Sequence, residues 1–440
     1  MKKKILFSFG GLLLTTVLAF GQPNVVPAKP QSGPIVITGA TIHIGNGKVI
    51  SNGYIAFDKG KITAVGEGAP AGMSGATMVD AAGQQLYPGF ICPITTLGLV
   101  ETEEGAKGTV DDTETGDINP HVRSLIAFNA ESKVIPTVRA NGVLLAQPTP
   151  EGGTVSGQSS VMMLDGWNWE DAAYKKDIGI HLTWPVARQA GRRRGFQLPG
   201  ATPTETPAEH AQKAIDEITS LFAQAQGYAT EARPAVKNLR LDAMRGLFNG
   251  SKKLFINADG AKEIAQVVNF AKRFGVQAVI VGGKESYLVA DILRQNNVPV
   301  IIKETQSLPD KDEDDVYQPY KLPHMLQDAG VLYGLTGIGF WRQRNLPFEA
   351  GEAVGYGLTK EQAISMITIN NAKILGIDKT TGTLEVGKDA NLFVSAGDAL
   401  DMLTLDVKSA YIQGRSVDLN TWHKMLYKRY SDKFGLPVKM

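Results

Sequence analysis

Six histidines and one cysteine are the side chains of this sequence best suited to hold a metal ion or to act as a nucleophile. No His-x-His, His-Glu-x-x-His or Cys-x-x-Cys spacing occurs, so the sequence has no compact metal-ligand motif. His181 is the best candidate for a pocket histidine, because it lies in the alternating stretch Ile178–Thr183, which is typical of a strand. Asp259 and Lys284 are further polar candidates, since each follows a predicted strand.

Cys92 and a glycine-rich segment are the other features that could supply a nucleophile or an anion site. A catalytic thiol needs a base or a positive field, and no neighbour of Cys92 in the sequence supplies one, so we expect a small buried apolar residue. Residues Gly153–Ser159 lack both the Gly-x-Ser-x-Gly spacing of a nucleophile elbow and the Gly-Lys-(Ser/Thr) of a phosphate loop. We expect this segment to be a loop beside the site.

The middle of the chain alternates short apolar runs with helical patterns, which predicts βα units and a parallel sheet. Seven strands are expected, at Phe90–Thr95, Val143–Gln147, Ile178–Thr183, Leu254–Asn257, Ala278–Val281, Val298–Ile302 and Val331–Leu335. With a plausible eighth strand, this α/β pattern favours a closed (β/α)8 TIM-like barrel, and an open doubly wound sheet is the alternative. Helices are expected at Ala261–Phe274, Tyr287–Asn296 and Lys360–Leu375. Residues 187–252 interrupt the rhythm and predict a helical insert with an arginine run, Arg192–Arg194, in its first loop and two helices, at roughly His210–Gln226 and Glu231–Leu247.

The N-terminus predicts export. Three lysines precede an apolar run, and residues 1–21 are typical of a secretory signal peptide, followed by a polar linker at 22–33. Removing the signal lysines changes the formal net charge from +1 to −2, which gives no argument for nucleic-acid binding. No other stretch is long and apolar enough for a stable membrane span. We therefore expect a periplasmic or extracellular protein.

Two motifs carry a resemblance to a known family. Tyr87–Gly98 reads Tyr-Pro-Gly-Phe-Ile-Cys-Pro-Ile-Thr-Thr-Leu-Gly and resembles the first barrel strand of the amidohydrolase superfamily, Pro-Gly-(Phe/Leu)-Ile-Asp-x-His-x-His-(Leu/Ile)-Gly. Gly382–Val394 resembles the Gly-x-(Ile/Leu)-x-x-Gly-x-x-Ala-Asp-Leu signature near the end of such chains, with Asn391 in the place of the Asp. The resemblance is to imidazolonepropionase-like exported members. It implies a composite β-sandwich from residues 34–87 and 380–420, a barrel over 88–379 and a C-terminal tail at 421–440.

The resemblance also implies where one or two Zn-like divalent metals would be held. Relatives use histidines on strands one, five and six, an Asp on strand eight, and often a bridging Lys or Glu on strand four, which we cannot locate here. The matching positions of this chain are all non-ligating, namely Ile94, Thr96, Asn257, Gly282 (with Gly283 beside it) and Gly337. Imidazole and carboxylate groups hold the metal ion that lowers the pKa of its bound water toward ~7, so their replacement removes the chemistry that the resemblance implies.

Two hypotheses follow. The first is a degenerate amidohydrolase, a pseudoenzyme without a metal cofactor that binds an unknown small molecule or pairs with itself or a homologous amidohydrolase. The second is an active amidohydrolase or dipeptidase-like enzyme, hydrolysing non-peptide or cyclic C–N bonds in a relocated or metal-free site. His181, Asp259, Asn257, Thr96 and Lys284 would supply that site. We favour the first hypothesis, because function follows the residues of a site rather than the fold.

Overall fold

A computed structural model describes residues 26–70, 72, 75–102, 106, 108–187, 206–232, 234, 236–309 and 313–437. The predicted signal peptide and the Arg192–Arg194 run lie outside these residues. Residues 26–33 carry no helix or strand, but they contact the folded chain: the Gln31 amide donates to the Phe57 carbonyl at 3.0 Å. In the described part of the chain, no helix is both long and apolar enough to cross a membrane.

The first of two sheets joins the two ends of the chain. Its eight strands run in the order β16-β15-β14-β5-β1-β2-β3, with β4 beside β1. Their bounds are β1 Ile35–His43, β2 Val49–Asp58, β3 Lys61–Glu67, β4 Thr77–Asp80, β5 Gln85–Pro88, β14 Leu392–Ser395, β15 Val407–Ile412 and β16 Arg415–Ser416. The N- and C-terminal halves meet where β5 pairs antiparallel with β14, with Tyr87 opposite Phe393.

The alternation of apolar residues and the tight turns between strands explain why these segments form a sheet. Apolar residues at every second position of β1 and β2 point to one face and form a separate apolar core with Leu392. The β2–β3 turn is Asp58-Lys59-Gly60, and Gly60 adopts φ +78° where a Cβ would lie 3.0 Å from the Gln413 carbonyl oxygen. The sheet also curls back, since the Ile62 N–H donates to the Lys388 carbonyl at 2.9 Å.

The second sheet has eight strands in the order β13-β12-β11-β10-β9-β8-β7-β6. The strands are β6 Phe90–Thr95, β7 Val143–Pro148, β8 Val155–Met163, β9 Ala173–Thr183, β10 Lys253–Ala258, β11 Ala278–Gly282, β12 Val300–Ile302 and β13 Tyr333–Leu335. All neighbouring pairs are parallel except those that β8 forms with β7 and β9. All seven predicted strands are present, and β8 is the eighth.

Side chains link the two edges of this sheet, so that it nearly closes into a barrel. The Ile94 N–H of β6 donates to the Thr336 hydroxyl, just after β13, at 3.1 Å, and that hydroxyl donates to the Ile94 carbonyl at 2.5 Å. The Asn371 amide donates to the carbonyls of both Ile91 and Leu335 at 2.8 and 2.9 Å. Backbone groups at the two edges are thus satisfied by two buried side chains, one just after β13 and one on α11.

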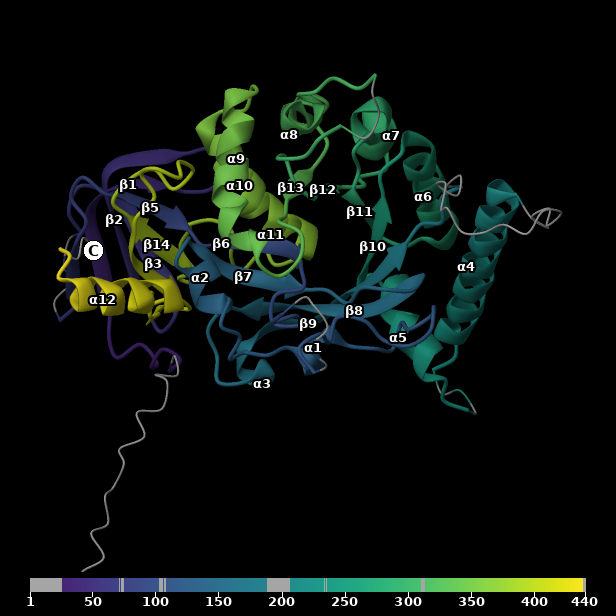
Figure 1. The fold of residues 1–440 in the computed structure, drawn as a ribbon, viewed down its shortest axis with the longest axis horizontal. Helices are drawn as coiled ribbons and strands as arrows, with labels where there is room; N and C mark the ends of the chain where they lie inside the picture. Colours follow the sequence, from purple (N-terminus) through teal and green to yellow (C-terminus); the bar gives the residue numbers. More distant parts are fainter. Residues whose placement is uncertain are drawn as a thin grey trace, which may run out of the picture.

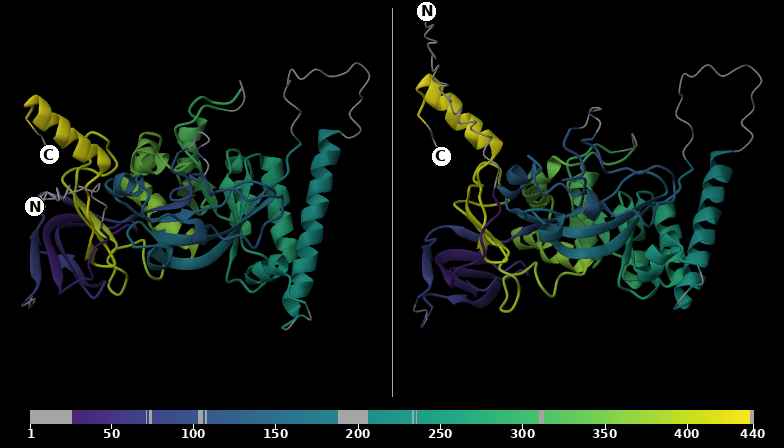
Figure 2. Two further views of the ribbon diagram at one scale, coloured as in Figure 1. Left: turned by 60° about the horizontal axis from the view of Figure 1, so that its bottom comes forward. Right: turned by 90° about the horizontal axis from the view of Figure 1, so that it is seen from below.

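Helices cover the barrel, and the first sheet lies at one end of the molecule with α4 at the other (Figures 1 and 2). They are α1 Ser124–Ala127, α2 Ile135–Arg139, α3 Trp169–Ala172, α4 Pro207–Thr230, α5 Leu239–Phe248, α6 Ala261–Phe274, η1 Ser286–Val289, α7 Ala290–Gln295, α8 Gln318–Asp328, η2 Arg342–Asn345, α9 Leu346–Gly355, α10 Lys360–Ile367, α11 Ile369–Leu375 and α12 Trp422–Phe434. Capping boxes begin α4 at Thr206 and α10 at Thr359.

Three local expectations need correction. Gly153–Ser159 is a loop only at its start, because β8 begins at Val155 and forms an antiparallel hairpin with β9. The helix expected over Lys360–Leu375 is broken into α10 and α11 at Thr368, whose backbone is non-helical (φ −123°, ψ −93°). The second insert helix begins at Leu239, after an Asn238 cap, and not near Glu231.

Candidate functional site

A cavity of about 1040 Å³ lies where the parallel strands of the barrel end. Its wall takes residues from the carboxyl ends of β6, β9 and β10, and from the segments that follow β7, β12 and β13. The start of α4 covers part of it through His210. The carboxyl ends of parallel barrel strands are where such folds carry their sites, because loops from every strand converge there.

The structure brings together only part of the predicted site. Ile94, Asn257, His181 and Asp259 line the cavity. The other four predicted residues are not part of the described wall. They are Thr96, buried in the turn after β6; Gly282, packed under the Asp259 side chain; Gly337, which follows β13; and Lys284, which is exposed.

His181 belongs to a buried polar group on the strand-four position of the barrel, β9. Its Nε2 atom lies 2.7 Å from the Ser159 hydroxyl and 3.2 Å from the Gln147 amide, which donates to Ser159 at 2.9 Å. An NH2 group only donates, so with the Gln147 NH2 group facing the ring, Nε2 is the acceptor. Burial lowers the pKa of His181 to about 3, so the ring is neutral at neutral pH. It stacks on Phe255 at 5.0 Å between ring centroids.

Asp259 is the wall residue with an unsatisfied charged atom. It directly follows β10, and its Oδ1 atom is buried without a hydrogen-bond partner among the described residues. Gly282 makes room for it, since a Cβ there would clash with Oδ1. A buried carboxylate oxygen without a donor is costly, so this atom needs an explanation.

Sequence reasoning missed four charged or titratable wall residues. They are Glu151, His210, Glu263 and Lys303. Lys303 could have been found, because it directly follows the predicted strand Val298–Ile302 and so lies at a strand end. Glu151 lies shortly after β7, and Glu263 lies in the first turn of α6. Surface acids are common at such positions, so neither residue stands out in the sequence. His210 reaches the cavity because α4 packs beside the barrel, which no local pattern indicates.

Cys92 is a buried residue, as the sequence predicts. Its side chain is fully buried, and its sulfur contacts the Thr336 hydroxyl at 3.3 Å and the Ile94 carbonyl at 3.4 Å. Burial raises the pKa of the Cys92 thiol to about 11, which keeps it protonated. The thiol therefore fills the barrel core between β6 and β13.

The side chains present do not fit the metal centre that this type of fold usually carries. In the described part of the chain, no group of three or more His, Cys, Asp or Glu side chains is arranged to hold a metal ion. At the strand ends, Ile94 is apolar and Asn257 is a neutral amide, while Gly282 and Gly337 have no side chain. These residues cannot supply the imidazole and carboxylate set that Zn²⁺ prefers.

Sequence comparisons identify related proteins over part of the chain. A model of the Amidohydrolase family matches residues 342–421. The amidohydrolase TasK of Hapsidospora irregularis is 34% identical over 118 residues, which covers 25% of this chain and 12% of that protein. The chain therefore spans about an eighth of the length of this curated relative.

Structural comparisons cover most of the chain. An amidohydrolase from Thermotoga maritima is 25% identical with a TM-score of 0.75, over 87% of this chain and 99% of that chain. A putative prolidase from Bifidobacterium longum has a TM-score of 0.53 at 18% identity, over 88% of this chain and 95% of that one. A Xaa-Pro dipeptidase with bound methionine in its active site has a TM-score of 0.51 at 13% identity, over 88% and 100%.

The barrel-like sheet, the sheet built from both chain ends and the strand-end cavity together define a mixed α/β fold. Together with these comparisons, they support the assignment of the chain to the amidohydrolase superfamily.

Proposed function

We propose that this protein binds a small molecule in the strand-end cavity and does not perform the metal-assisted C–N hydrolysis of its superfamily. The observation that carries the proposal is the donor set: the cavity is retained at about 1040 Å³, while the described positions that match the family's ligands carry no metal donor. We further propose that the sheet is a (β/α)8 barrel in which the β8–β9 hairpin replaces one βα unit.

The ligand class follows from the wall. Asp259, Glu151 and Glu263 give the described wall three carboxylates. Among the lysines and arginines, only Lys303 opposes them in that wall. This balance favours a ligand with N–H donors, such as an amine or a primary amide. A dipeptidase relative binds methionine in its active site, which makes amino acids and dipeptides the first compounds to test.

The cellular setting is part of the same proposal. The first 21 residues would direct export, so that the mature chain works in the periplasm or outside the cell. A non-hydrolysing, imidazolonepropionase-like chain would act as a binding protein, alone or as the partner of itself or of an active homologous amidohydrolase. Neither role requires a metal cofactor or nucleic acid.

Asp259→Asn tests the proposal. Isothermal titration of the full chain against a panel of amino acids, Xaa-Pro dipeptides and their amides should find a bound compound that mass spectrometry recovers intact. Asp259→Asn should weaken its binding roughly 10- to 100-fold, the range of one charged hydrogen bond. Glu170→Gln, an exposed carboxylate on α3, should leave binding unchanged. Equal affinity in Asp259→Asn, or a panel without any binder, would refute the proposed ligand class.

One observation favours a second candidate, a metal-independent hydrolase. Ser159 and His181 form the 2.7 Å contact of a nucleophile–base pair. Burial weakens this candidate, because Ser159 is fully buried and is not part of the described cavity wall. Under this candidate, hydrolysis of a panel compound would resist chelators and disappear in Ser159→Ala. Under the first proposal, neither the wild type nor Ser159→Ala hydrolyses any panel compound.

A further inference from the structure

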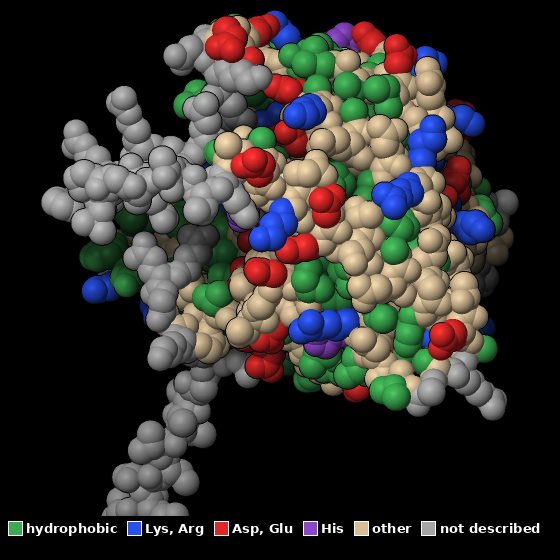
Figure 3. All heavy atoms as spheres, turned by 90° about the vertical axis from the view of Figure 1, so that its right-hand side faces the viewer, with side chains coloured by type: hydrophobic (Ala, Val, Ile, Leu, Met, Phe, Trp, Pro, Cys, Tyr) green, Lys and Arg blue, Asp and Glu red, His purple; other side chains and the backbone are tan. Residues whose placement is uncertain are grey.

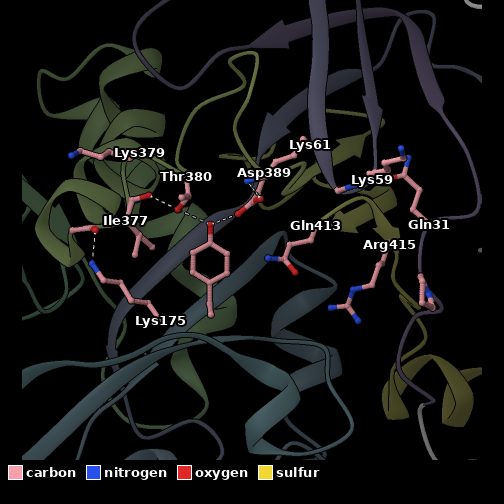
Figure 4. A pocket seen from close by; sticks show the side chains of 14 residues that line it. Gln31, Lys59, Lys61, Lys175, Ile377, Lys379, Thr380, Asp389, Gln413 and Arg415 are labelled. Carbon is pink, nitrogen blue, oxygen red and sulfur yellow. Dashed lines mark hydrogen bonds and ion pairs between the residues drawn. The ribbon is translucent and has the colours of Figure 1, made fainter.

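A second crevice, of about 720 Å³, lies away from the barrel mouth where the two sheets meet (Figure 4). Distant parts of the chain form it: the N-terminal segment at Gln31, the β2–β3 turn, the start of β9, residues 376–380 after α11, and the β15–β16 turn. A ligand held there would contact both sheets at once.

The crevice is strongly basic. Among the described residues, its wall holds five cationic side chains and one carboxylate, namely Lys59, Lys61, Lys175, Lys379, Arg415 and Asp389. The chain as a whole is balanced, with 45 basic and 44 acidic residues, so this excess is a local segregation of charge. By contrast, red and blue side chains are mixed over the end of the molecule that carries α4 (Figure 3). A crevice lined by one sign of charge concentrates counter-ions.

The one wall carboxylate is already neutralised. Lys61 Nζ lies 2.6 Å from Asp389 Oδ1, and the Tyr174 hydroxyl donates to Asp389 Oδ2 at 2.5 Å. Asp389 therefore does not cancel the charge of the remaining cations. Its contacts instead fix the position of Lys61 and of the Tyr174 ring at the crevice wall.

Two of the five cations are free to meet a ligand. Arg415 pairs with Asp165, and Lys175 donates to the Gly376 carbonyl at 2.7 Å. Lys59 and Lys379 form no ion pair or side-chain hydrogen bond with the rest of the described chain. They lie on opposite sides of Asp389 in Figure 4. A ligand that satisfies both must carry negative charge at two places.

We propose that this crevice binds a multivalent anion, one that bears two or more phosphate or carboxylate groups. Lys59 and Lys379 hold its charged groups, while Lys61, Lys175 and Arg415 supply a positive field that is already fixed by hydrogen bonds. The site is separate from the strand-end cavity and does not depend on the function proposed for it. Binding would stabilise the junction of the two sheets.

The test uses inorganic pyrophosphate and citrate as probes, with the full chain in isothermal titration at low ionic strength. We expect saturable binding of one or both at one site per chain, weakened about tenfold or more in the double variant Lys59→Gln/Lys379→Gln. The matched control is Lys48→Gln/Lys262→Gln, which removes two exposed lysines outside the crevice and should bind as the wild type does. Tighter binding of pyrophosphate indicates a phosphate ligand, and tighter binding of citrate indicates a carboxylate.

Several results would overturn the proposal. They are the absence of binding by both probes, equal affinity in the double variant, or an equal loss in the control variant, which would indicate a general charge effect. Thermal melts without a probe check that both double variants fold. Asp259→Asn should leave pyrophosphate and citrate binding intact, which separates this site from the barrel cavity.

Discussion

Asp165→Asn should lower the free energy of unfolding by about 3–5 kcal/mol, the cost of leaving a buried charge without its partner. The Asp165 side chain is 2% exposed and accepts from Arg139 Nη1 and Arg415 Nη1, both at 3.1 Å. The Ala28 N–H donates to the same carboxylate at 3.1 Å. Asp165 thus joins the barrel, the first sheet and the N-terminal segment. A urea titration at pH 7.5 measures the loss as a lower midpoint at an unchanged slope.

Arg139→Met should cost less than Asp165→Asn. In Arg139→Met the Asp165 carboxylate keeps Arg415, whereas Asp165→Asn leaves the buried Arg139 guanidinium without a counter-charge. Burial already lowers the pKa of Arg139, and its Nε and Nη2 atoms have no partner in the described structure.

The control is Asp242→Asn, which breaks a partly exposed pair with Arg245 and should cost under about 1 kcal/mol. Equal losses for Asp242→Asn and Asp165→Asn would contradict the prediction.

Glu349→Gln should make the protein more stable than the wild type above pH 8, by about 5 kcal/mol at most. Glu349 is 3% exposed in α9, and Thr305 N–H donates to its Oε2 at 3.2 Å. Burial raises the pKa of Glu349 to about 8, from an ordinary value of 4.5. Between pH 4.5 and about 8, the folded protein therefore keeps a proton on Glu349 that the unfolded chain has lost.

The sign follows from this linkage. Because the folded state binds the extra proton, the contribution of Glu349 to stability is fully present below about pH 4.5 and is lost as the pH rises through about 8. Glutamine cannot ionise, so the variant lacks this slope. Urea midpoints for both proteins from pH 5 to 9 should converge at the acid end and separate at the alkaline end. Glu217→Gln, an exposed α4 position, should follow the wild type throughout. Parallel curves for Glu349→Gln and wild type would show that Glu349 ionises normally.

Much of the fold was predictable because the barrel strands are locally marked. Phe90–Thr95 and Ala261–Phe274 match β6 and α6 to the residue, since Pro88-Gly89 and Gly275 punctuate apolar patterns of clear period. The antiparallel β8 was missed because Val155–Met163 is buried at every position and has no alternation to read. Its direction is set by pairing with β9, which lies beyond local sequence.

The candidate site was predictable only where strand order fixes it. Ile94, His181 and Asn257 line the cavity because they lie on strands whose carboxyl ends converge. Thr96 was assigned to the cavity by a motif, but the chain turns after Thr95, and the Thr96 N–H donates to the Gly339 carbonyl at 2.9 Å. The exposed Lys284 was a candidate from its place after a strand, and nothing local distinguishes it from Lys303, which does reach the wall.

The central claim is that the family's cavity persists here without the family's metal centre. The most direct test is to load the full chain with excess Zn²⁺, remove free metal by gel filtration, and measure bound metal by mass spectrometry. Hydrolysis of the dipeptide and amide panel is followed in the same samples with and without a chelator. We predict far less than one Zn²⁺ per chain and no chelator-sensitive hydrolysis. One or two Zn²⁺ per chain together with hydrolysis that a chelator abolishes would contradict the account.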